Sequence, residues 1–436
     1  MSRKTLRLLV AAAFSVAVLP ALAQLPTAKP EQVGMSSQRL GRIAPALKQE
    51  IDQGRIPGAV VMIARKGKLV YSEAFGFQDK AAGTPMKTDA VFRIYSMTKP
   101  LVSVAAMMLV EEGRIQLTDP LSKFFPACKN MMVSVPRADS VYARVTYTTV
   151  PADREITVQD LLRHTSGLAY GEITQNAPVR DAYAKAGLYL QGVRDYDDRD
   201  LTPAEFVDRL CKAPLAQQPG TMWEYSLSVD MLGRVVEAAS GQRLADFLEE
   251  RLLKPLKMVD TAFWVPQEKM SRLAQPLAVD SATGAKVNVI DVSAAPKSDS
   301  GGAGGVSTAG DYLRFSQAML NGGQLDGQRI LSRSTVGFMT SDHLGTRIAQ
   351  PTQPGELLMG VPGYTFGLGF TVRQGPGVAG VPGSQGEYMW AGYAGTFFWI
   401  DPKEELVAVY MTQAPSPIRS MYRRLMKQLV YGAIVD

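Results

Sequence analysis

The stretch Ile94-Tyr95-Ser96-Met97-Thr98-Lys99-Pro100-Leu101-Val102 marks the place where a polar turn gives way to a long apolar run. The run continues to Val110, and Gly113 is a natural stop, so we predict a helix that begins near Ser96. Ser96 and Lys99 stand three positions apart and would lie in contact on one face of that helix. A hydroxyl nucleophile beside an amine that can accept its proton is typical of a serine hydrolase that works without histidine.

The predicted position of Ser96 at a helix N-terminus supports this interpretation. Unpaired amides and the helix dipole favour negative charge on the serine oxygen and disfavour a protonated Lys99. Pro100 falls in the first turn, where a helix tolerates proline. A Ser-x-x-Lys pattern is nevertheless expected about once by chance in such a chain. An ordinary capping serine followed by a solvated lysine fits the local sequence equally well, so the pattern alone leaves both interpretations open.

Composition limits the classes of function. The chain has 436 residues, of which 46% are hydrophobic, enough for a large core and for more than one domain. It holds 47 basic and 41 acidic residues. Both signs are interspersed along the chain, without a long basic block or aromatic-basic alternation, so we expect no nucleic-acid partner.

The first residues have the layout of a signal peptide. Arg3, Lys4 and Arg7 precede the apolar residues 8–19, and the small residues of Ala21-Leu22-Ala23 offer a cleavage site before Gln24. We therefore predict a signal peptide over residues 1–23 and a periplasmic or secreted protein. No later apolar run approaches the roughly 20 residues that span a bilayer, so we expect no membrane span.

The cysteines leave one question open. Cys128 and Cys211 are the only two, and export would permit a disulfide, but the sequence does not choose between a disulfide and two separate buried thiols. With two cysteines and two histidines, His164 and His343, a structural zinc site is not expected. We expect neither a metal ion nor a cofactor.

The hydrophobic pattern predicts strands at both ends of the chain and helices between them. Residues 59–65 and 69–77 read as a hairpin that turns at Lys66-Gly67-Lys68. Near the C-terminus we predict strands over residues 364–372, 387–392, 395–400 and 406–412, then a helix over residues 417–431.

This order predicts an α/β (α+β) fold in which both termini build an antiparallel sheet flanked by helices, with a mainly helical domain inserted. We expect residues 24–94 and 300–436 to form the sheet domain and residues 95–299 the helical domain, with the active site at their interface. Within the second domain, residues 131–200 show weak periodicity and read as surface loops or an insertion near a cleft.

Two further motifs make the serine-lysine pair specific. Glu224-Tyr225-Ser226-Leu227 and Met389-Trp390-Ala391-Gly392-Tyr393 follow Ser96-Met97-Thr98-Lys99 in the chain. In this order the three resemble the motifs of the penicillin-recognising serine hydrolases, which include class C β-lactamases, D-alanyl-D-alanine carboxypeptidases and family VIII carboxylesterases. Two softer matches agree, Leu161-Leu162-Arg163-His164-Thr165-Ser166-Gly167-Leu168 and Gly304-Gly305-Val306-Ser307-Thr308-Ala309-Gly310-Asp311. The resemblance covers about residues 30–430 and implies a β-lactamase-like fold.

Departures from the β-lactamase pattern favour the esterase branch. Leu227 stands where β-lactamases of this kind usually have the asparagine of Tyr-x-Asn, and Trp390 stands where they usually have the lysine of Lys-Thr-Gly. Family VIII esterases are similar to this chain at both motifs, and a tryptophan supplies an apolar wall instead of a cation. The resemblance implies a serine carboxylesterase acting on small esters of short to medium acyl chain, with weak β-lactam hydrolysis. The alternatives are a β-lactamase, a D-alanyl-D-alanine carboxypeptidase, or a non-catalytic binding protein of this fold, which the intact motifs disfavour.

The resemblance also implies roles for the site residues. Ser96 would be acylated, Lys99 would accept its proton, and Tyr225 would relay protons to the leaving alcohol. Which of Lys99 and Tyr225 is the principal base stays open. The backbone amides of Ser96 and Tyr393 would form the oxyanion hole.

Three further residues would shape the substrate site. Trp390 and Leu227 would contact the substrate, and Gly392 would let it approach the strand closely. We expect His164 to be structural and His343 to be solvated. No Gly-x-Ser-x-Gly pattern occurs, which disfavours an α/β-hydrolase.

Overall fold

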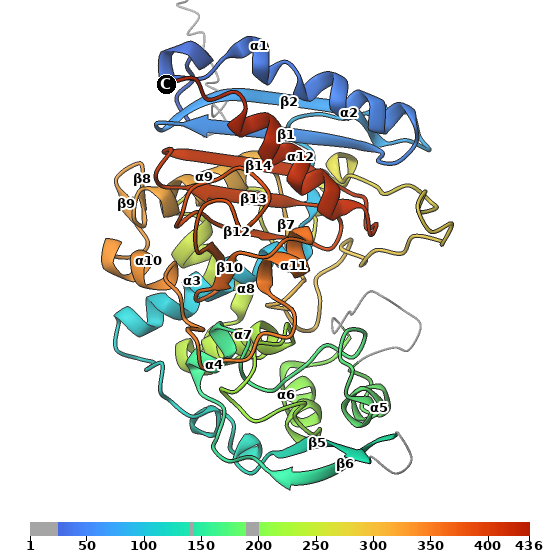
Figure 1. Cartoon of the computed structure of the whole chain (residues 1–436), viewed down its shortest axis with the longest axis vertical. Helices are drawn as coiled ribbons and strands as arrows, with labels where there is room; N and C mark the ends of the chain where they lie inside the picture. Colours follow the sequence, from blue (N-terminus) through green and yellow to red (C-terminus); the bar gives the residue numbers. More distant parts are fainter. Residues whose placement is uncertain (1–24, 140–143, 189–199) are drawn as a thin grey trace, which may run out of the picture.

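The computed structural model describes residues 25–139, 144–188 and 200–436 (Figure 1). The predicted signal peptide, residues 1–23, lies outside the described residues. None of the helices that the structure describes combines the length and the apolar character needed to cross a membrane.

An eight-stranded antiparallel sheet joins the two ends of the chain, as the sequence predicted. Its strand order is β10-β11-β12-β13-β14-β1-β2-β3. β1 (Gly58–Arg65) pairs with β2 (Lys68–Asp79) on one side and with β14 (Leu406–Thr412) on the other. The remaining strands are β3 (Thr84–Pro85), β10 (Tyr364–Phe366), β11 (Thr371–Arg373), β12 (Tyr388–Ala391) and β13 (Phe397–Asp401).

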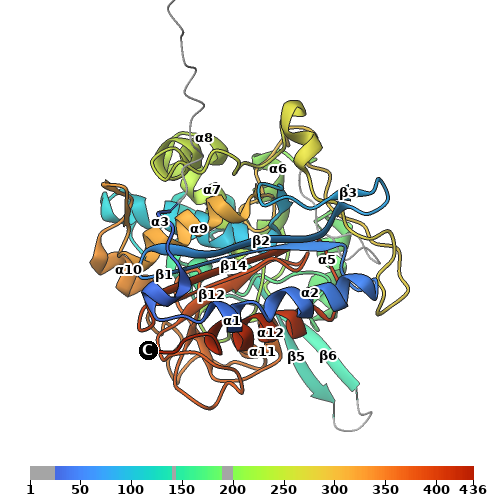
Figure 2. The same ribbon diagram turned by 90° about the horizontal axis from the view of Figure 1, so that it is seen from above.

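The central strands are buried on both faces because helices cover both sides of the sheet. Every residue of β1 and β14 is buried, which matches their near-continuous runs of valine, isoleucine, methionine and alanine. Seen from above, one group of helices lies on one side of the sheet and a second group on the other (Figure 2). The first group is α1 (Ser37–Leu40), α2 (Ile43–Asp52), α11 (Pro354–Met359) and α12 (Arg419–Tyr431), and the second is α3 (Thr98–Glu111), α7 (Ser228–Ser240), α8 (Leu244–Leu248) and α9 (Ala309–Leu320).

Helix α3 is the central helix of the second group. Its residues from Thr98 to Leu109 are all buried, including Lys99, and it packs against α7. α4 (Val158–Leu162) and α6 (Pro203–Lys212) pack against α7, and α5 (Ala177–Lys185) lies farther from the pair, beyond α6 (Figure 1). The fold is therefore β-lactamase-like, as the motifs implied, while the division into domains at residues 95 and 300 stays a prediction.

The structure differs from the sequence prediction in two places. Residues 364–372 form two strands, β10 and β11, because the chain turns at Gly367 and Gly369, whose φ is +93°. Residues 131–200, predicted as surface loops or an insertion near a cleft, contain a hairpin of β5 (Met132–Asp139) and β6 (Arg144–Pro151). Figure 1 shows this hairpin at the end of the molecule opposite β1 and β2.

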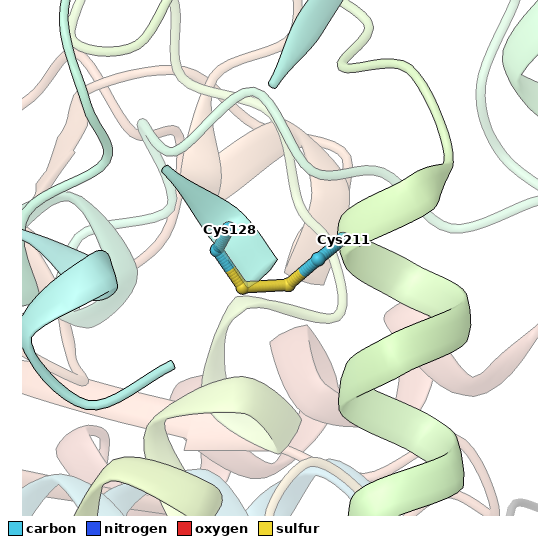
Figure 3. The surroundings of a disulfide bond; sticks show 2 residues. All are labelled: Cys128 and Cys211. Carbon is cyan, nitrogen blue, oxygen red and sulfur yellow. A yellow bond between two sulfur atoms is a disulfide. The ribbon is translucent and has the colours of Figure 1, made fainter. Parts of the chain in front are cut away.

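A disulfide joins Cys128 to Cys211 (Figure 3), which decides the question that the sequence left open. It links the short helix η4 (Pro126–Cys128) to α6, and the two α-carbons are 4.9 Å apart. The closed loop spans 83 residues. A loop of that length corresponds to about 4 kcal/mol of stabilisation when chain entropy is the dominant effect.

Candidate active site

Ser96 lies on a tight turn immediately before α3. The turn is the 3₁₀ helix η2 (Tyr95–Met97), and Tyr95 has a φ of +45°, which is uncommon for a residue with a side chain. Hydrogen bonds hold the turn in place: Thr98 Oγ1 donates to the Tyr95 carbonyl oxygen (2.6 Å), and the Tyr312 hydroxyl donates to the Met97 carbonyl oxygen (2.8 Å). The predicted placement of Ser96 at a helix N-terminus is confirmed, although the serine belongs to the preceding turn.

Lys99 is buried beside Ser96. Its Nζ donates to Ser96 Oγ (3.3 Å), to the Tyr170 hydroxyl (3.0 Å) and to the Gly302 carbonyl oxygen (2.8 Å). Burial lowers the pKa of Lys99 from 10.5 to about 7, and the acidic side chains of Asp230 and Glu172 only partly oppose the shift. A large fraction of Lys99 is therefore neutral near pH 7 and able to accept a proton.

Tyr225 completes the contacts of Ser96. Its hydroxyl donates to Ser96 Oγ at 2.5 Å, and its ring lies 4.6 Å from Lys99 Nζ. Burial raises the pKa of Tyr225 above its ordinary value of 10, so the phenol keeps its proton at neutral pH. The structure thus brings the three predicted catalytic residues together: Lys99 Nζ and the Tyr225 hydroxyl both contact Ser96 Oγ, and Lys99 in its neutral form can accept the serine proton.

A cavity of about 470 Å³ opens at Ser96. Four other residues that the sequence singled out line it, Tyr225, Trp390, Gly392 and Tyr393. Most of the remaining lining residues are aromatic or aliphatic, with one acidic and two basic residues among them: Tyr95, Tyr170, Glu172, Ile173, Ala303, Leu357, Leu358, Ala391, Pro417, Arg419 and Arg423.

Gly392 is in closer contact with the protein than the sequence suggested. A Cβ on residue 392 would lie 2.3 Å from the Ile94 carbonyl oxygen and 2.2 Å from Thr396 Oγ1. The sequence explained this glycine by the approach of substrate. In the structure, the absent side chain lets the end of β12 approach the turn that carries Ser96.

The structure does not bring Leu227 to the cavity. Its side chain is 1% exposed and packs in the main hydrophobic core, because residue 227 is where the chain turns inward to begin α7. Leu227 occupies the motif position at which β-lactamases usually have an asparagine. The predicted contact between Leu227 and the substrate has no support in the geometry.

Sequence reasoning missed the loop that holds Lys99 from the other side. Asp230 Oδ1 accepts hydrogen bonds from Ser300 Oγ (2.6 Å) and from the Gly302 amide (2.9 Å), and Gly302 in turn binds Lys99. A Cβ on Gly302 would lie 2.1 Å from Asp230 Oδ2. The glycine-dense sequence 301–305 was the available signal for this close approach.

The two histidines take different places. His164 is buried, and its Nδ1 lies 3.1 Å from Ser226 Oγ while its ring lies 5.0 Å from the Tyr225 ring. Burial lowers the pKa of His164 well below 6.5, so it is a neutral residue behind the site, which agrees with a structural role. His343 is partly exposed; its ring packs against Phe338, and its Nε2 lies 2.8 Å from the Phe338 carbonyl oxygen, so the expected solvation is only partial.

Within the parts of the chain that the structure describes, no group of three or more histidine, cysteine, aspartate and glutamate residues is placed to hold a metal ion.

Comparison with known proteins agrees with this geometry. The family model described as Beta-lactamase matches residues 43–432. Protein Rv1367c of Mycobacterium tuberculosis is 34% identical over 376 residues, which make up 84% of this chain and 88% of that protein. Esterase EstB of Burkholderia gladioli is 30% identical over 391 residues, 85% of this chain and 89% of EstB.

A solved structure is similar over the same region. EstCE1, described as a hydrolase with promiscuous acyltransferase activity, has a TM-score of 0.70 and 26% identity, covering 92% of this chain and 99% of its own. The chain belongs to the β-lactamase family, as a serine hydrolase of the family VIII carboxylesterase branch.

Proposed function

We propose that the protein is a serine carboxylesterase that hydrolyses small esters of short to medium acyl chain through an acyl-enzyme on Ser96. One observation carries this proposal: Ser96 Oγ lies within hydrogen-bond distance of both Lys99 Nζ (3.3 Å) and the Tyr225 hydroxyl (2.5 Å). A nucleophile, a base and an acid therefore meet beside the cavity that Ser96 and Tyr225 line.

The pKa of Lys99 is lowered and that of Tyr225 is raised, which assigns the base role to Lys99 and the acid role to Tyr225. Neutral Lys99 takes the proton of Ser96 as the serine oxygen attacks the ester carbonyl carbon, since its pKa is lowered to about 7. Tyr225, whose pKa is raised, donates its proton to the leaving alcohol and recovers one from Lys99. In deacylation the same groups work in reverse on water, which attacks the acyl carbon and releases the acid and free Ser96.

The backbone amides of Ser96 and Tyr393 would stabilise the oxyanion of the tetrahedral intermediate. Both residues line the cavity, and the absence of a side chain at Gly392 lets the end of β12 pack against the Ser96 turn. A single oxyanion donor contributes about 3 kcal/mol in serine hydrolases of other folds.

The walls of the cavity support an ester substrate. Trp390 is 1% exposed and forms an aromatic wall with Tyr225, whose ring centroid lies 5.5 Å away. A volume of about 470 Å³ suits short to medium acyl groups better than long ones. The names of the relatives, esterase for EstB and hydrolase for EstCE1, support the same substrate class.

Weak β-lactam hydrolysis is a second candidate activity. It is favoured by Arg419, which lines the cavity and supplies the positive charge that Trp390 does not. A lactam carboxylate could meet that charge, although no lysine stands at the third motif.

We also propose that the protein is exported after loss of residues 1–23. The basic and then apolar order of these residues supports this, and the Cys128–Cys211 disulfide fits an oxidising compartment. The N-terminal mass of the mature protein tests it: a chain that begins at Gln24 is expected, and retention of residue 1 in the exported protein would contradict it.

Two chromogenic substrates test the activity. We expect rapid hydrolysis of p-nitrophenyl butyrate and slow hydrolysis of nitrocefin, and the Ser96→Ala variant should lose both. Ser103→Ala is the matched control, because Ser103 is a buried serine of the same helix that does not line the cavity. Faster turnover of nitrocefin would favour a β-lactamase, and no turnover of either would favour a binding protein.

A further inference from the structure

We propose that Arg423 is a positioning residue that polarises the peptide group between Gly392 and Tyr393 and so strengthens the Tyr393 amide as an oxyanion donor. This inference rests on the proposed esterase mechanism, in which that amide faces the developing negative charge.

Arg423 is a buried cation of α12 that binds backbone carbonyls. Its side chain is 3% exposed; Nη2 donates to the Gly392 carbonyl oxygen and Nη1 to the Leu358 carbonyl oxygen, both at 2.7 Å. Its Nε has no hydrogen-bond partner, and no carboxylate forms a salt bridge with it among the residues that the structure describes. The positive charge of Arg423 is thus directed at two peptide groups.

Burying a guanidinium without a counter-ion is costly, and arginine does not escape that cost by losing its proton. A neutral side chain of similar length would fill the same space at a smaller desolvation cost. The charge therefore calls for an explanation beyond packing, and the partner of Nη2 supplies one.

The Gly392 carbonyl and the Tyr393 N–H belong to one planar peptide group. A cation on the carbonyl oxygen draws electron density through the conjugated C–N bond, which makes the N–H more positive and a better donor. The gain is largest when full negative charge develops on the substrate oxygen, so it lowers the barrier more than it strengthens substrate binding.

Arg423 also fixes the orientation of this peptide group. The Gly392 amide donates to the Thr396 carbonyl oxygen (2.8 Å), and the Gly392 α-carbon packs against the Ile94 carbonyl. These contacts fix the preceding peptide group, and the Arg423 hydrogen bond to the Gly392 carbonyl oxygen, which also accepts from the Gly395 amide (3.2 Å), limits rotation of the Gly392–Tyr393 peptide group.

The neighbouring Arg424 provides a matched control. It lies on the same helix and donates to the Met359 carbonyl oxygen, the residue after the Leu358 partner of Arg423. Arg424 does not line the cavity. Replacing it removes an arginine-carbonyl contact between the same two helices, α11 and α12, without touching the Gly392 peptide group.

The experiment compares Arg423→Met, Arg423→Lys and Arg424→Met in the full protein. It measures kcat and KM for p-nitrophenyl butyrate, and Ki for phenylboronic acid. The serine oxygen adds to the boron atom to give a tetrahedral anion that occupies the oxyanion position, while the serine proton passes to Lys99. Thermal unfolding confirms that each variant is folded.

We expect Arg423→Met to lower kcat by about 10- to 100-fold with KM changed by less than about threefold, and to raise the Ki of phenylboronic acid by the same factor as it lowers kcat/KM. Arg423→Lys, which keeps a cation, should lose less, and Arg424→Met should stay within about twofold of the wild type.

Three results would overturn the proposal: a folded Arg423→Met enzyme with wild-type kcat, a Lys variant as slow as the Met variant, or a loss of kcat without a matching loss of boronate affinity. If Arg423→Met does not fold, the loss of kcat is compared with the loss of boronate affinity in Arg423→Lys instead. A wild-type protein that neither hydrolyses the ester nor reacts at Ser96 would instead contradict the proposed function itself.

Discussion

Gly392 and Ile94 meet with no room for a side chain between them, since a Cβ on residue 392 would lie 2.3 Å from the Ile94 carbonyl oxygen. The contact joins the end of β12, which carries one proposed oxyanion amide, to the turn that carries the nucleophile. Residues almost 300 positions apart in sequence are in this way placed at one end of the cavity.

Replacing Gly392 by alanine should disturb catalysis more than folding. The added methyl group forces the end of β12 and the Ser96 turn apart, at a cost of about 2 kcal/mol in stability. We expect kcat/KM for p-nitrophenyl butyrate to fall at least about tenfold. Gly375→Ala is the control, because a Cβ there meets nothing within 4 Å. Equal activity of the two variants would show that this contact does not position the site.

The pH dependence of the reaction should follow Lys99. Its pKa is lowered to about 7, so below pH 7 the amine is protonated and cannot accept the serine proton. We expect kcat/KM to fall about tenfold per pH unit below pH 7 and to level off above it. Rates measured from pH 5.5 to 9 test this, and a profile that is flat between pH 6 and 8 would exclude Lys99 as the base.

Removing the hydroxyl of Tyr225 should slow the enzyme while leaving it folded. Tyr225→Phe keeps the ring contacts but loses the proton donor on Ser96 Oγ, so kcat should fall by about 10²- to 10⁴-fold. Tyr183→Phe is the matched variant, since that buried hydroxyl accepts a hydrogen bond from the Ala169 amide outside the cavity. A Tyr225→Phe enzyme with a near-normal rate would remove the tyrosine from proton transfer.

The disulfide should matter for stability and not for chemistry. Replacing Cys128 and Cys211 by serine opens a loop of 83 residues and should lower the free energy of unfolding by about 4 kcal/mol. Neither cysteine lines the cavity, so kcat at 25 °C should be unchanged. Urea unfolding and esterase rates on the same samples measure both, and an inactive but fully stable variant would contradict this assignment.

Local patterns predicted the features that depend on neighbours in sequence. The pair Ser96 and Lys99 followed from helical spacing, and the hairpin of β1 and β2 followed from two apolar runs around Lys66-Gly67-Lys68. Tyr225 and Trp390 could be placed near Ser96 only through the resemblance to a family, because nothing in their own segments specifies a distant partner.

The remaining parts of the site depend on long-range packing that no local pattern records. The Gly302 carbonyl reaches Lys99 across 203 residues, and Arg423 reaches Gly392 from the last helix. Leu227 shows the converse: its motif position suggested substrate contact, but the turn into α7 directs the side chain to the core. Similarly, Gly367 and Gly369 break a run that reads as one strand into two.

Covalent labelling tests the central claim, that Ser96 is the nucleophile, most directly. The protein is treated with a fluorophosphonate, its intact mass is measured, and the adduct is mapped to a residue, with Ser96→Ala and Ser103→Ala treated in parallel. We predict one adduct, on Ser96, in the wild type and in Ser103→Ala, and none in Ser96→Ala. An adduct on another residue, or labelling that persists in folded Ser96→Ala, would contradict the account.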